Sequence, residues 1–131
     1  MCRPVFILSH AAMRHWCLLF LIFAVTGCSE KPQTMQVAGG DAARGKASIQ
    51  RYGCVACHTI PGIAGHGSNV GPPLTKMALR AYVGGVLPNT PEDLVRWLQN
   101  PPEVDPRTAM PNLGVSEAEA KDIAAYLYTL K

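Results

Sequence analysis

The apolar positions of the chain form one continuous run near the N-terminus and shorter, spaced groups after it. The run extends from Trp16 to Val25 and contains no charged residue (WCLLFLIFAV). It is shorter than the roughly 20 apolar residues that a membrane-spanning helix needs. Because Arg3 and Arg14 precede it, the run matches the hydrophobic region of an export signal. We therefore predict a signal peptide over residues 1–27.

Downstream of this segment, the spacing of apolar residues predicts short helices and no β-strand. Asp41 is a suitable N-cap for a helix over residues 42–51. Residues 74–82 are expected to hold one or two helical turns. Thr90, followed by a proline and two acidic residues, begins a further helix that ends before the proline pair at 101–102.

The last predicted helix has the clearest signals. Ser116 and Glu119 form a capping box. Apolar residues then recur at helical spacing and make one face, namely Ala120, Ile123, Ala124, Leu127 and Leu130. Because every predicted element is helical, the fold class is all-α, with three to four short helices.

Long segments rich in glycine and proline separate these helices, at 59–73 and 101–115. A polar, flexible tether is predicted over residues 28–39, which leaves a folded domain over residues 40–131. Loops of this length in a compact domain need something to pack on, and a domain this small is marginally stable without a staple. Something other than side chains must therefore fill the core.

The end of the signal segment carries a modification motif. Residues 25–28 (VTGC) resemble the lipobox of bacterial lipoproteins, in which cleavage before the cysteine leaves it to carry the lipid. We therefore expect Cys28 to be lipidated and the domain to be anchored on the periplasmic side of a bacterial membrane. An ordinary signal peptide or a short uncleaved anchor is the alternative. A start at Met13 instead of Met1 would give a signal of more ordinary proportions.

Composition and charge exclude some classes of protein. The chain carries 12 Lys+Arg against 9 Asp+Glu, and 16% of its residues are charged. This balance fits neither a basic nucleic-acid-binding arm nor an acidic disordered chain. Of the 5 cysteines, only Cys54 and Cys57 remain in the domain beyond Cys28, so no disulfide framework is available to staple it.

These two cysteines belong to the motif Cys54-Val55-Ala56-Cys57-His58, which is the C-x-x-C-H attachment motif of a c-type haem. Two thiols at this spacing reach the two vinyl groups of one porphyrin and form thioethers. The adjacent His58 then lies beneath the ring as an axial iron ligand. The sequence therefore predicts one covalently bound haem c, and this group would fill the missing core.

Two other kinds of site use similar residues. A zinc site would need Cys54, Cys57, His58 and His66 as its four ligands, and the direct adjacency of a cysteine and a histidine is awkward for tetrahedral geometry. A thioredoxin-like C-x-x-C motif needs a βαβ context, which the pattern lacks. Both are weaker interpretations than haem.

The second axial ligand has three candidates downstream. His66 lies on the same glycine-rich loop as His58, too close along the chain to reach the opposite face of the ring. Met77 lies in a locally helical context that favours a packing role. Met110, followed by Pro111, lies in a loop between two helices that can fold over the far face. We predict Met110 as the ligand, with Met77 or an open position as the alternatives.

From residue 40 to the end, the chain resembles the class I cytochromes c. The features that carry the resemblance appear in family order: Gly45, CVACH, Gly71-Pro72-Pro73-Leu74, Trp97, Ala109-Met110-Pro111 and Tyr126. The run LPNTPEDL at residues 87–94 is most like the cytochrome c domain fused to subunit II of haem–copper oxidases. The copper-binding domain of that subunit has no counterpart in this sequence, which suggests a stand-alone lipoprotein.

The resemblance implies further roles around the haem. It implies that the Pro72 carbonyl accepts the Nδ1–H of His58, fixing the ring and raising its donor strength. It implies that Trp97 donates to a haem propionate, with simple core packing as the alternative. Gly45 and Tyr126 would mark the crossing of the first and last helices.

A His/Met-ligated haem has no open iron position, so we expect an electron carrier of a respiratory chain rather than an enzyme. No catalytic residues, small-molecule substrate or nucleic acid is expected. The expected partners are redox proteins, either a terminal oxidase or a quinol-linked donor, with the membrane reached through the lipid anchor. The alternative is a haem sensor or peroxidase-like enzyme in which Met110 dissociates, and a third interpretation is a binding module with a purely structural haem.

Overall fold

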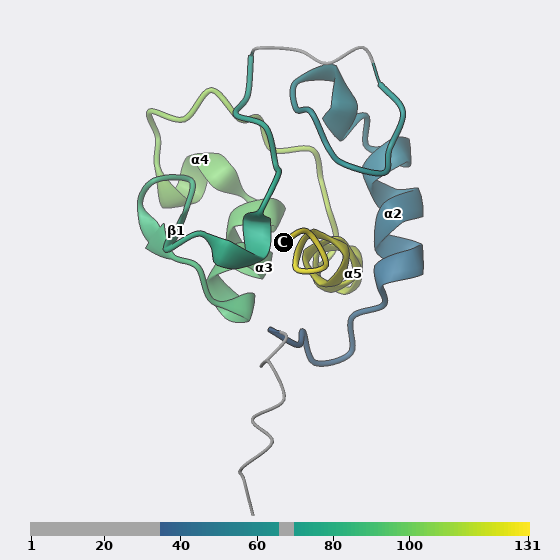
Figure 1. The fold of residues 1–131 in the computed structure, drawn as a ribbon. Helices are drawn as coiled ribbons and strands as arrows, with labels where there is room; N and C mark the ends of the chain where they lie inside the picture. The colour runs from purple at the N-terminus through teal and green to yellow at the C-terminus, as the bar shows by residue number, and fades with distance from the viewer. Residues whose placement is uncertain (1–34, 66–69) are drawn as a thin grey trace, which may run out of the picture. The chain divides into compact units, whose positions relative to one another are not determined.

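The computed structural model describes residues 35–65 and 70–131 (Figure 1). The elements in chain order are α2 (Ala42–Arg51), the 3₁₀ turns η2 (Cys54–Ala56) and η3 (Met77–Leu79), β1 (Tyr82–Val83), β2 (Leu87–Pro88), α3 (Pro91–Gln99), α4 (Pro101–Val104) and α5 (Glu117–Leu127). The predicted signal peptide, Cys28 and His66 lie outside the described residues. Within the described ranges, no helix is long and apolar enough to cross a membrane.

Three of the helices begin where their capping residues predict. The Asp41 side chain accepts the backbone N–H of Arg44 at the start of α2, over a distance of 2.8 Å. Thr90 caps α3, whose first residue is a proline. Ser116 and Glu119 form the reciprocal capping box of α5. The three predicted helix starts are confirmed. They can be predicted from sequence because a cap acts over three or four residues and needs no distant partner.

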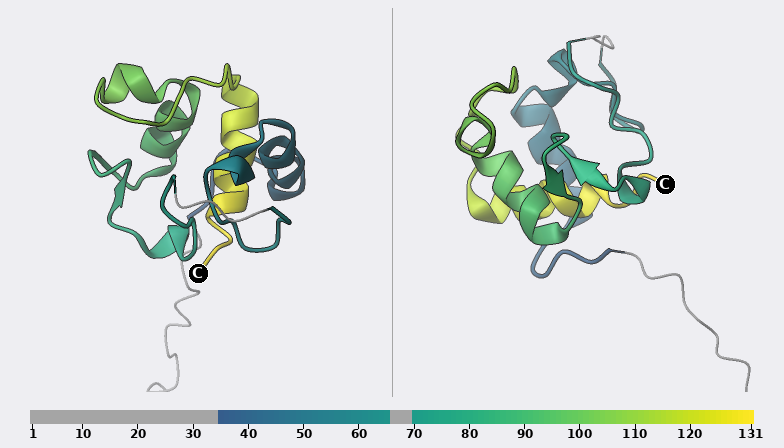
Figure 2. Two further views of the ribbon diagram at one scale, coloured as in Figure 1. Left: turned by 90° about the horizontal axis from the view of Figure 1, so that it is seen from above. Right: turned by 90° about the vertical axis from the view of Figure 1, so that its left-hand side faces the viewer.

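Helices α2 and α5 pack against each other where they cross, and the left view of Figure 2 shows α5 from the side and α2 nearly end-on. Their backbones meet at Gly45, where a Cβ would overlap the carbonyl oxygen of Asp122. Beside this contact, Nε and Nη2 of Arg44 each donate to the Asp122 carboxylate at 2.8 Å. These bonds lower the pKa of Asp122. The absence of a side chain at Gly45 is therefore what allows the two helices to approach this closely.

Two features differ from the helix-and-loop prediction. Residues 101–104 form the short helix α4, so the prediction of a loop over 101–115 is wrong at its start. Proline is tolerated in the first turn of a helix because no N–H partner is needed there, so the proline pair ends α3 and begins α4. In addition, β1 and β2 pair antiparallel, with Val83 opposite Leu87. Each strand has two residues, which is too short for an alternating pattern.

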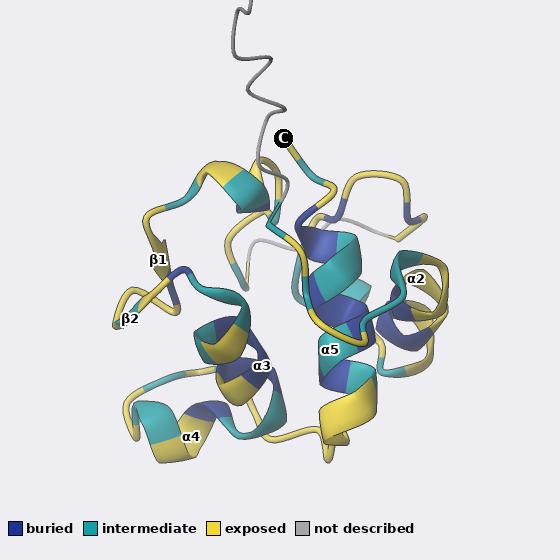
Figure 3. Ribbon diagram, turned by 90° about the horizontal axis from the view of Figure 1, so that it is seen from below, coloured by how far each residue is buried: buried dark blue, intermediate teal, exposed yellow. Residues whose placement is uncertain are grey.

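The buried side chains gather where α2, α3 and α5 face one another (Figure 3). On α5, Ala120 and Ala124 are 0% exposed and Ile123 is 1% exposed. Of the residues expected to form the tether, 35–39 are described, and Met35 and Val37 pack against this core. The arrangement is all-α as predicted, with one small hairpin added.

Candidate functional site

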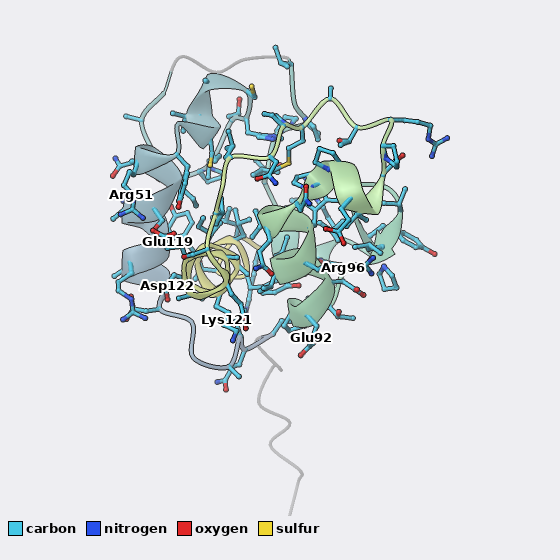
Figure 4. All side chains as sticks on the ribbon, turned by 180° about the vertical axis from the view of Figure 1, so that it is seen from behind. Arg51, Glu92, Arg96, Glu119, Lys121 and Asp122 are labelled. Carbon is cyan, nitrogen blue, oxygen red and sulfur yellow. The ribbon has the colours of Figure 1, made fainter. Side chains whose placement is uncertain are left out.

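A cavity of about 360 Å³ lies between α2, which borders it through Ile49, and the elements that follow α2. Its walls come from η2 and the loop after it, from η3 and the β1–β2 hairpin, from α3 and α5, and from residues 108–111. This volume lies in the range of about 300–1,000 Å³ that cofactor sites have. The charged side chains labelled in Figure 4, on α2, α3 and α5, do not border it. Its lining is predominantly apolar, which suits a large hydrophobic group.

The η2 turn brings the motif residues to one wall of the cavity. Gly53 precedes the turn with a φ of 67°, and His58 donates its backbone N–H to the Cys54 carbonyl at 3.0 Å. Cys54, Cys57 and His58 all border the cavity, and both cysteines are free thiols. Burial raises the pKa of the Cys54 thiol. Burial at this position therefore favours the neutral thiol over the thiolate.

His58 is fixed by contacts that leave one ring nitrogen available. Its Nδ1 lies 2.8 Å from the carbonyl oxygen of Pro72. A carbonyl only accepts, so Nδ1 carries the proton and Nε2 carries the lone pair. Within the described ranges, Nε2 has no hydrogen-bond partner. A Cβ at Gly71 would lie 2.6 Å from Nδ1, so only glycine lets the chain pass this close to the ring.

Both candidate methionines border the same cavity. Met110 is half-buried on the loop between α4 and α5, and its backbone N–H donates to the Thr108 hydroxyl at 3.1 Å. Met77 is 3% exposed in the η3 turn and belongs to the buried core. The structure thus brings both thioethers to the cavity, whereas His66 lies outside the described residues.

Trp97 also borders the cavity, from α3. Its side chain is 7% exposed and lies against Gly84, where a Cβ would come within 2.6 Å of the ring. The hydrogen bonds of the described residues include none from its indole N–H. Trp97 therefore packs at the cavity wall, and its indole N–H is available as a hydrogen-bond donor.

Tyr126 holds the loop that follows the motif. Its hydroxyl donates to the Pro61 carbonyl at 2.7 Å, so the side chain joins α5 to the first residues of that loop. The closest approach of α5 to Gly45 lies at Asp122 and Ile123. Tyr126 thus has a contact that sequence reasoning did not assign to it.

Sequence reasoning also missed the wall made by residues 80–85. Arg80, Tyr82, Gly84 and Gly85 all border the cavity. The Gly84-Gly85 pair, with φ of 59° and 76°, forms the tip of the hairpin. A glycine pair between two apolar stretches is the signal that could have predicted this turn.

The residues that border the cavity fit a c-type haem. They offer a pair of thiols separated by two residues, an imidazole with a free nitrogen and two thioethers, within a predominantly apolar surface. In residues 35–65 and 70–131, no group of three or more His, Cys, Asp or Glu side chains gathers where it could hold a metal ion. The donor set is thus one that completes the coordination of a haem iron rather than one that encloses a bare ion.

Comparison with known proteins relates this chain to components of cytochrome c oxidases. The model of the family described as "Cytochrome C oxidase, cbb3-type, subunit III" matches residues 40–127. The chain is also 30% identical over 89 residues to the cytochrome c oxidase subunit 2 of Alkalihalophilus pseudofirmus. That match covers 67% of this chain and 25% of the relative. The chain thus spans about a quarter of the length of that protein.

Proposed function

This chain belongs to the c-type cytochromes of the cbb3-type oxidase subunit III family, and we propose that it is a lipid-tethered carrier of single electrons. In this proposal one haem c is bound covalently through Cys54 and Cys57, with His58 and Met110 as the axial ligands of its iron. The carrier passes electrons to or within a terminal oxidase or a related respiratory complex. It has no substrate of its own.

One observation carries the proposal. The two thiols, the imidazole of His58 and the thioether of Met110 border one apolar cavity, although Met110 is 52 positions from the nearest of the other three. A haem bound there would supply an iron centre that gains or loses one electron between its ferric and ferrous states. The apolar walls exclude water from that centre, which disfavours the more highly charged ferric state and raises the reduction potential.

The hydrogen bond of His58 supports its role as a ligand. With its proton held on Nδ1 by the Pro72 carbonyl, the ring presents Nε2 in the form that binds a metal. The same bond increases the electron density on the ring and fixes its orientation. Pro72 thereby acts on the iron through His58 rather than by direct contact.

Met110 is favoured over Met77 as the second ligand because of how each is held. Met77 is 3% exposed and packs within the core, and its carbonyl accepts a hydrogen bond from the Asn89 side chain. Met110 is half-buried on a loop whose local contact is the Thr108 hydroxyl. A side chain on such a loop can settle on an inserted group without disturbing the core.

Trp97 is proposed as a hydrogen-bond donor to a haem propionate. Its ring is 7% exposed at the cavity wall, and within the described ranges its N–H has no other partner. A donor in this position would offset part of the cost of placing a carboxylate beside an apolar site.

The comparisons support an oxidase as the redox partner. Both the family description and the named relative are cytochrome c oxidase components, and this chain matches the relative over 25% of its length. A quinol-linked complex is proposed as the upstream donor. The domain would accept one electron from that donor and release it to the oxidase.

The membrane attachment is proposed from the sequence motif at Cys28, with residues 1–27 removed as a signal peptide. The predicted tether runs from Cys28 to residue 39, so its reach is at most about 40 Å, at roughly 3.5 Å for each extended residue. This short reach confines the carrier to partners on the same membrane surface. A Cys28→Ser variant is expected to move from the membrane fraction to the soluble periplasm, and an uncut N-terminus on the exported protein would contradict the assignment.

The haem and its ligands are tested on the full chain produced with a c-type haem maturation system. The wild-type protein should retain haem on a denaturing gel and show the weak red absorption band of ferric iron bonded to a thioether. Met110→His should remove this band, keep the iron six-coordinate and lower the reduction potential, because imidazole favours ferric iron more than thioether does.

Met77→Leu is the matched control and should leave the band unchanged. If Met77→Leu removes the band instead, Met77 is the ligand. If the wild-type protein lacks the band and binds carbon monoxide or peroxide at its iron, the protein is the sensor or peroxidase-like enzyme rather than a carrier.

A further inference from the structure

Asn89 is a polar side chain buried at the end of the β1–β2 hairpin, directly before the N-cap of α3. It is 8% exposed, and it is not among the residues that border the cavity. A buried amide of this kind costs free energy unless its hydrogen-bonding groups all find partners. The hydrogen-bond partners of Asn89 therefore show which parts of the domain it joins.

Both polar atoms of the Asn89 side chain and its backbone N–H have hydrogen-bond partners. Its Nδ2 donates to the carbonyls of Met77 and Arg80, each at 2.9 Å. Its Oδ1 accepts the hydroxyl proton of Tyr128 at 3.0 Å, and its backbone N–H donates to the Ala81 carbonyl at 3.0 Å. Since a side-chain amide has two N–H donors, both are committed to the segment that contains η3.

That segment forms one wall of the cavity. Met77 and Arg80, whose carbonyls Asn89 holds, both border the cavity with their own side chains. The segment starts from a strained position, because Lys76 has a φ of 52°, which is uncommon for a residue with a side chain. Such a conformation persists only where surrounding contacts enforce it. The two bonds from Asn89 are contacts that enforce it from outside the segment.

We propose that Asn89 is a positioning residue for the haem site, and that its two amide hydrogen bonds keep the wall at residues 77–85 closed and thereby hold the reduction potential high. This inference rests on the proposed function, because it requires a haem in the cavity. Ferric haem carries one more positive charge than ferrous haem. A wall that opens admits water, which stabilises the more charged ferric state and lowers the potential.

The test compares reduction potentials of the holoprotein. Asn89→Leu keeps the size of the side chain and removes its three side-chain hydrogen bonds, while the backbone bond to Ala81 is retained. It should shift the equilibrium of electron exchange with a fixed reference couple about tenfold toward the oxidised cytochrome, which is about 59 mV for one electron. The amides of Ala78, Leu79 and Arg80 should also exchange with solvent faster.

Asp122→Asn is the matched control, because Asp122 is buried and hydrogen-bonded between α2 and α5 but does not border the cavity. It should lower the free energy of unfolding. The equilibrium constant for electron exchange with the reference couple should change by less than a factor of two. Tyr128→Phe removes the hydroxyl bond to Asn89 and keeps both amide N–H bonds, so its potential should also stay near that of the wild type.

If Asn89→Leu does not accumulate, Asn89→Ala is measured in its place, because it also lacks the N–H donors and, like Asn89, it carries no charge that would shift the potential directly. A potential equal to that of the wild type in the Asn89 variant, or an equal drop in Asp122→Asn, would overturn the inference. Failure of the proposed function gives a different result, in which the wild-type protein itself holds no covalent haem on a denaturing gel.

Discussion

Two regions of the domain are held together in different ways. The helix pair consists of α2 and α5, and it is joined by ion pairs between side chains, namely Arg44 with Asp122 and Arg51 with Glu119. The loop wall consists of residues 53–65, 70–90 and 105–115 around the cavity. There, side chains hold backbone carbonyls, as His58 does with Pro72 and Asn89 does with Met77.

The difference has an energetic meaning. The helix pair buries apolar side chains away from the cavity, as Ala120 and Ala124 are each 0% exposed and do not border it, so this part of the core forms without any added group. The loop wall lines the cavity of about 360 Å³, and the side chains that face the cavity make no packing contacts across it. The helix pair is thus specified by its own packing, whereas the loop wall depends on the group that fills it.

The largest expected effect follows from removing that group. In the Cys54→Ala, Cys57→Ala double variant the haem cannot be attached, so the loop wall has nothing to pack on. We expect the holoprotein to disappear and the remaining chain to be largely unfolded, as measured by helical circular dichroism and thermal melting. A haem-free chain with helical dichroism and a cooperative melt would mean that the helix pair can support the whole domain.

The next effect tests the helix pair itself. Gly45→Ala places a methyl group against the Asp122 carbonyl and should reduce the free energy of unfolding by roughly 2–3 kcal/mol, the range for overpacking at a closed contact. Gly85→Ala is the control, because Gly85 has a φ of 76° and no atom within 4 Å of a Cβ. Backbone strain alone should cost about 1 kcal/mol there. Denaturant titration of both holoproteins measures the difference, and equal costs would contradict the close contact of the helices.

An alkaline transition tests the junction between the two regions. Tyr128 lies just after α5 and donates to Asn89. Burial, reinforced by the carboxylates of Glu92 and Asp93, raises the pKa of Tyr128 to about 12. This pKa is above the value of about 10 in the unfolded chain, so the folded state holds the Tyr128 proton more tightly. The stability that this contributes is present below pH 10 and is lost as the pH rises through 12. The loss should be at most about 2–3 kcal/mol, at roughly 1.4 kcal/mol per pKa unit.

The transition is measured by denaturant titration of the holoprotein at a series of pH values between 9 and 12. In Tyr128→Phe the free energy of unfolding should fall less over this range, because the contribution of the Tyr128 phenol is missing. Tyr82 is exposed, so Tyr82→Phe should behave like the wild type. If Tyr128→Phe loses stability over this range as steeply as the wild type, the phenol is not shielded from solvent.

The sequence predicts the helix pair far better than the loop wall. Asp41 and Ser116 signal helix starts within a few residues, and α2 spans the predicted 42–51. The motif at residues 54–58 predicts the chemistry of the site because its spacing is set by the haem itself. Both kinds of signal are local in the sequence, so they can be interpreted without a structure.

The contacts that shape the loop wall are not local. Asn89 and Met77 are 12 residues apart, and Tyr126 and Pro61 are 65 residues apart. In both cases a side chain bonds a backbone carbonyl, and a carbonyl is present at every position, so no residue type marks the acceptor. The helix α4 was missed for a related reason, since a proline pair ends one helix and begins another with equal ease.

The smallest expected effect concerns how the loop wall meets a redox partner. From Gly53 to Leu74 the chain contains no charged residue. Of the nearby basic side chains, Arg107 is paired with Asp105 at 3.0 Å. The Arg80 guanidinium donates to the carbonyls of Pro73 and Thr75. A surface of this kind gives little long-range attraction, and a membrane tether would supply the local concentration instead.

We therefore expect the oxidation of the reduced cytochrome by oxidase-containing membranes to change less than twofold between low and physiological ionic strength. Over that range the screening length falls from about 30 Å to about 8 Å, so attraction between charged patches would be strongly weakened. The rate is followed from the absorbance of the reduced haem, with Arg107→Gln as a variant that should leave it unchanged. A tenfold fall in rate with added salt would show instead that Lys76, Arg80 and Arg107 steer the partner, and that charge rather than the uncharged rim of the loop wall governs the encounter.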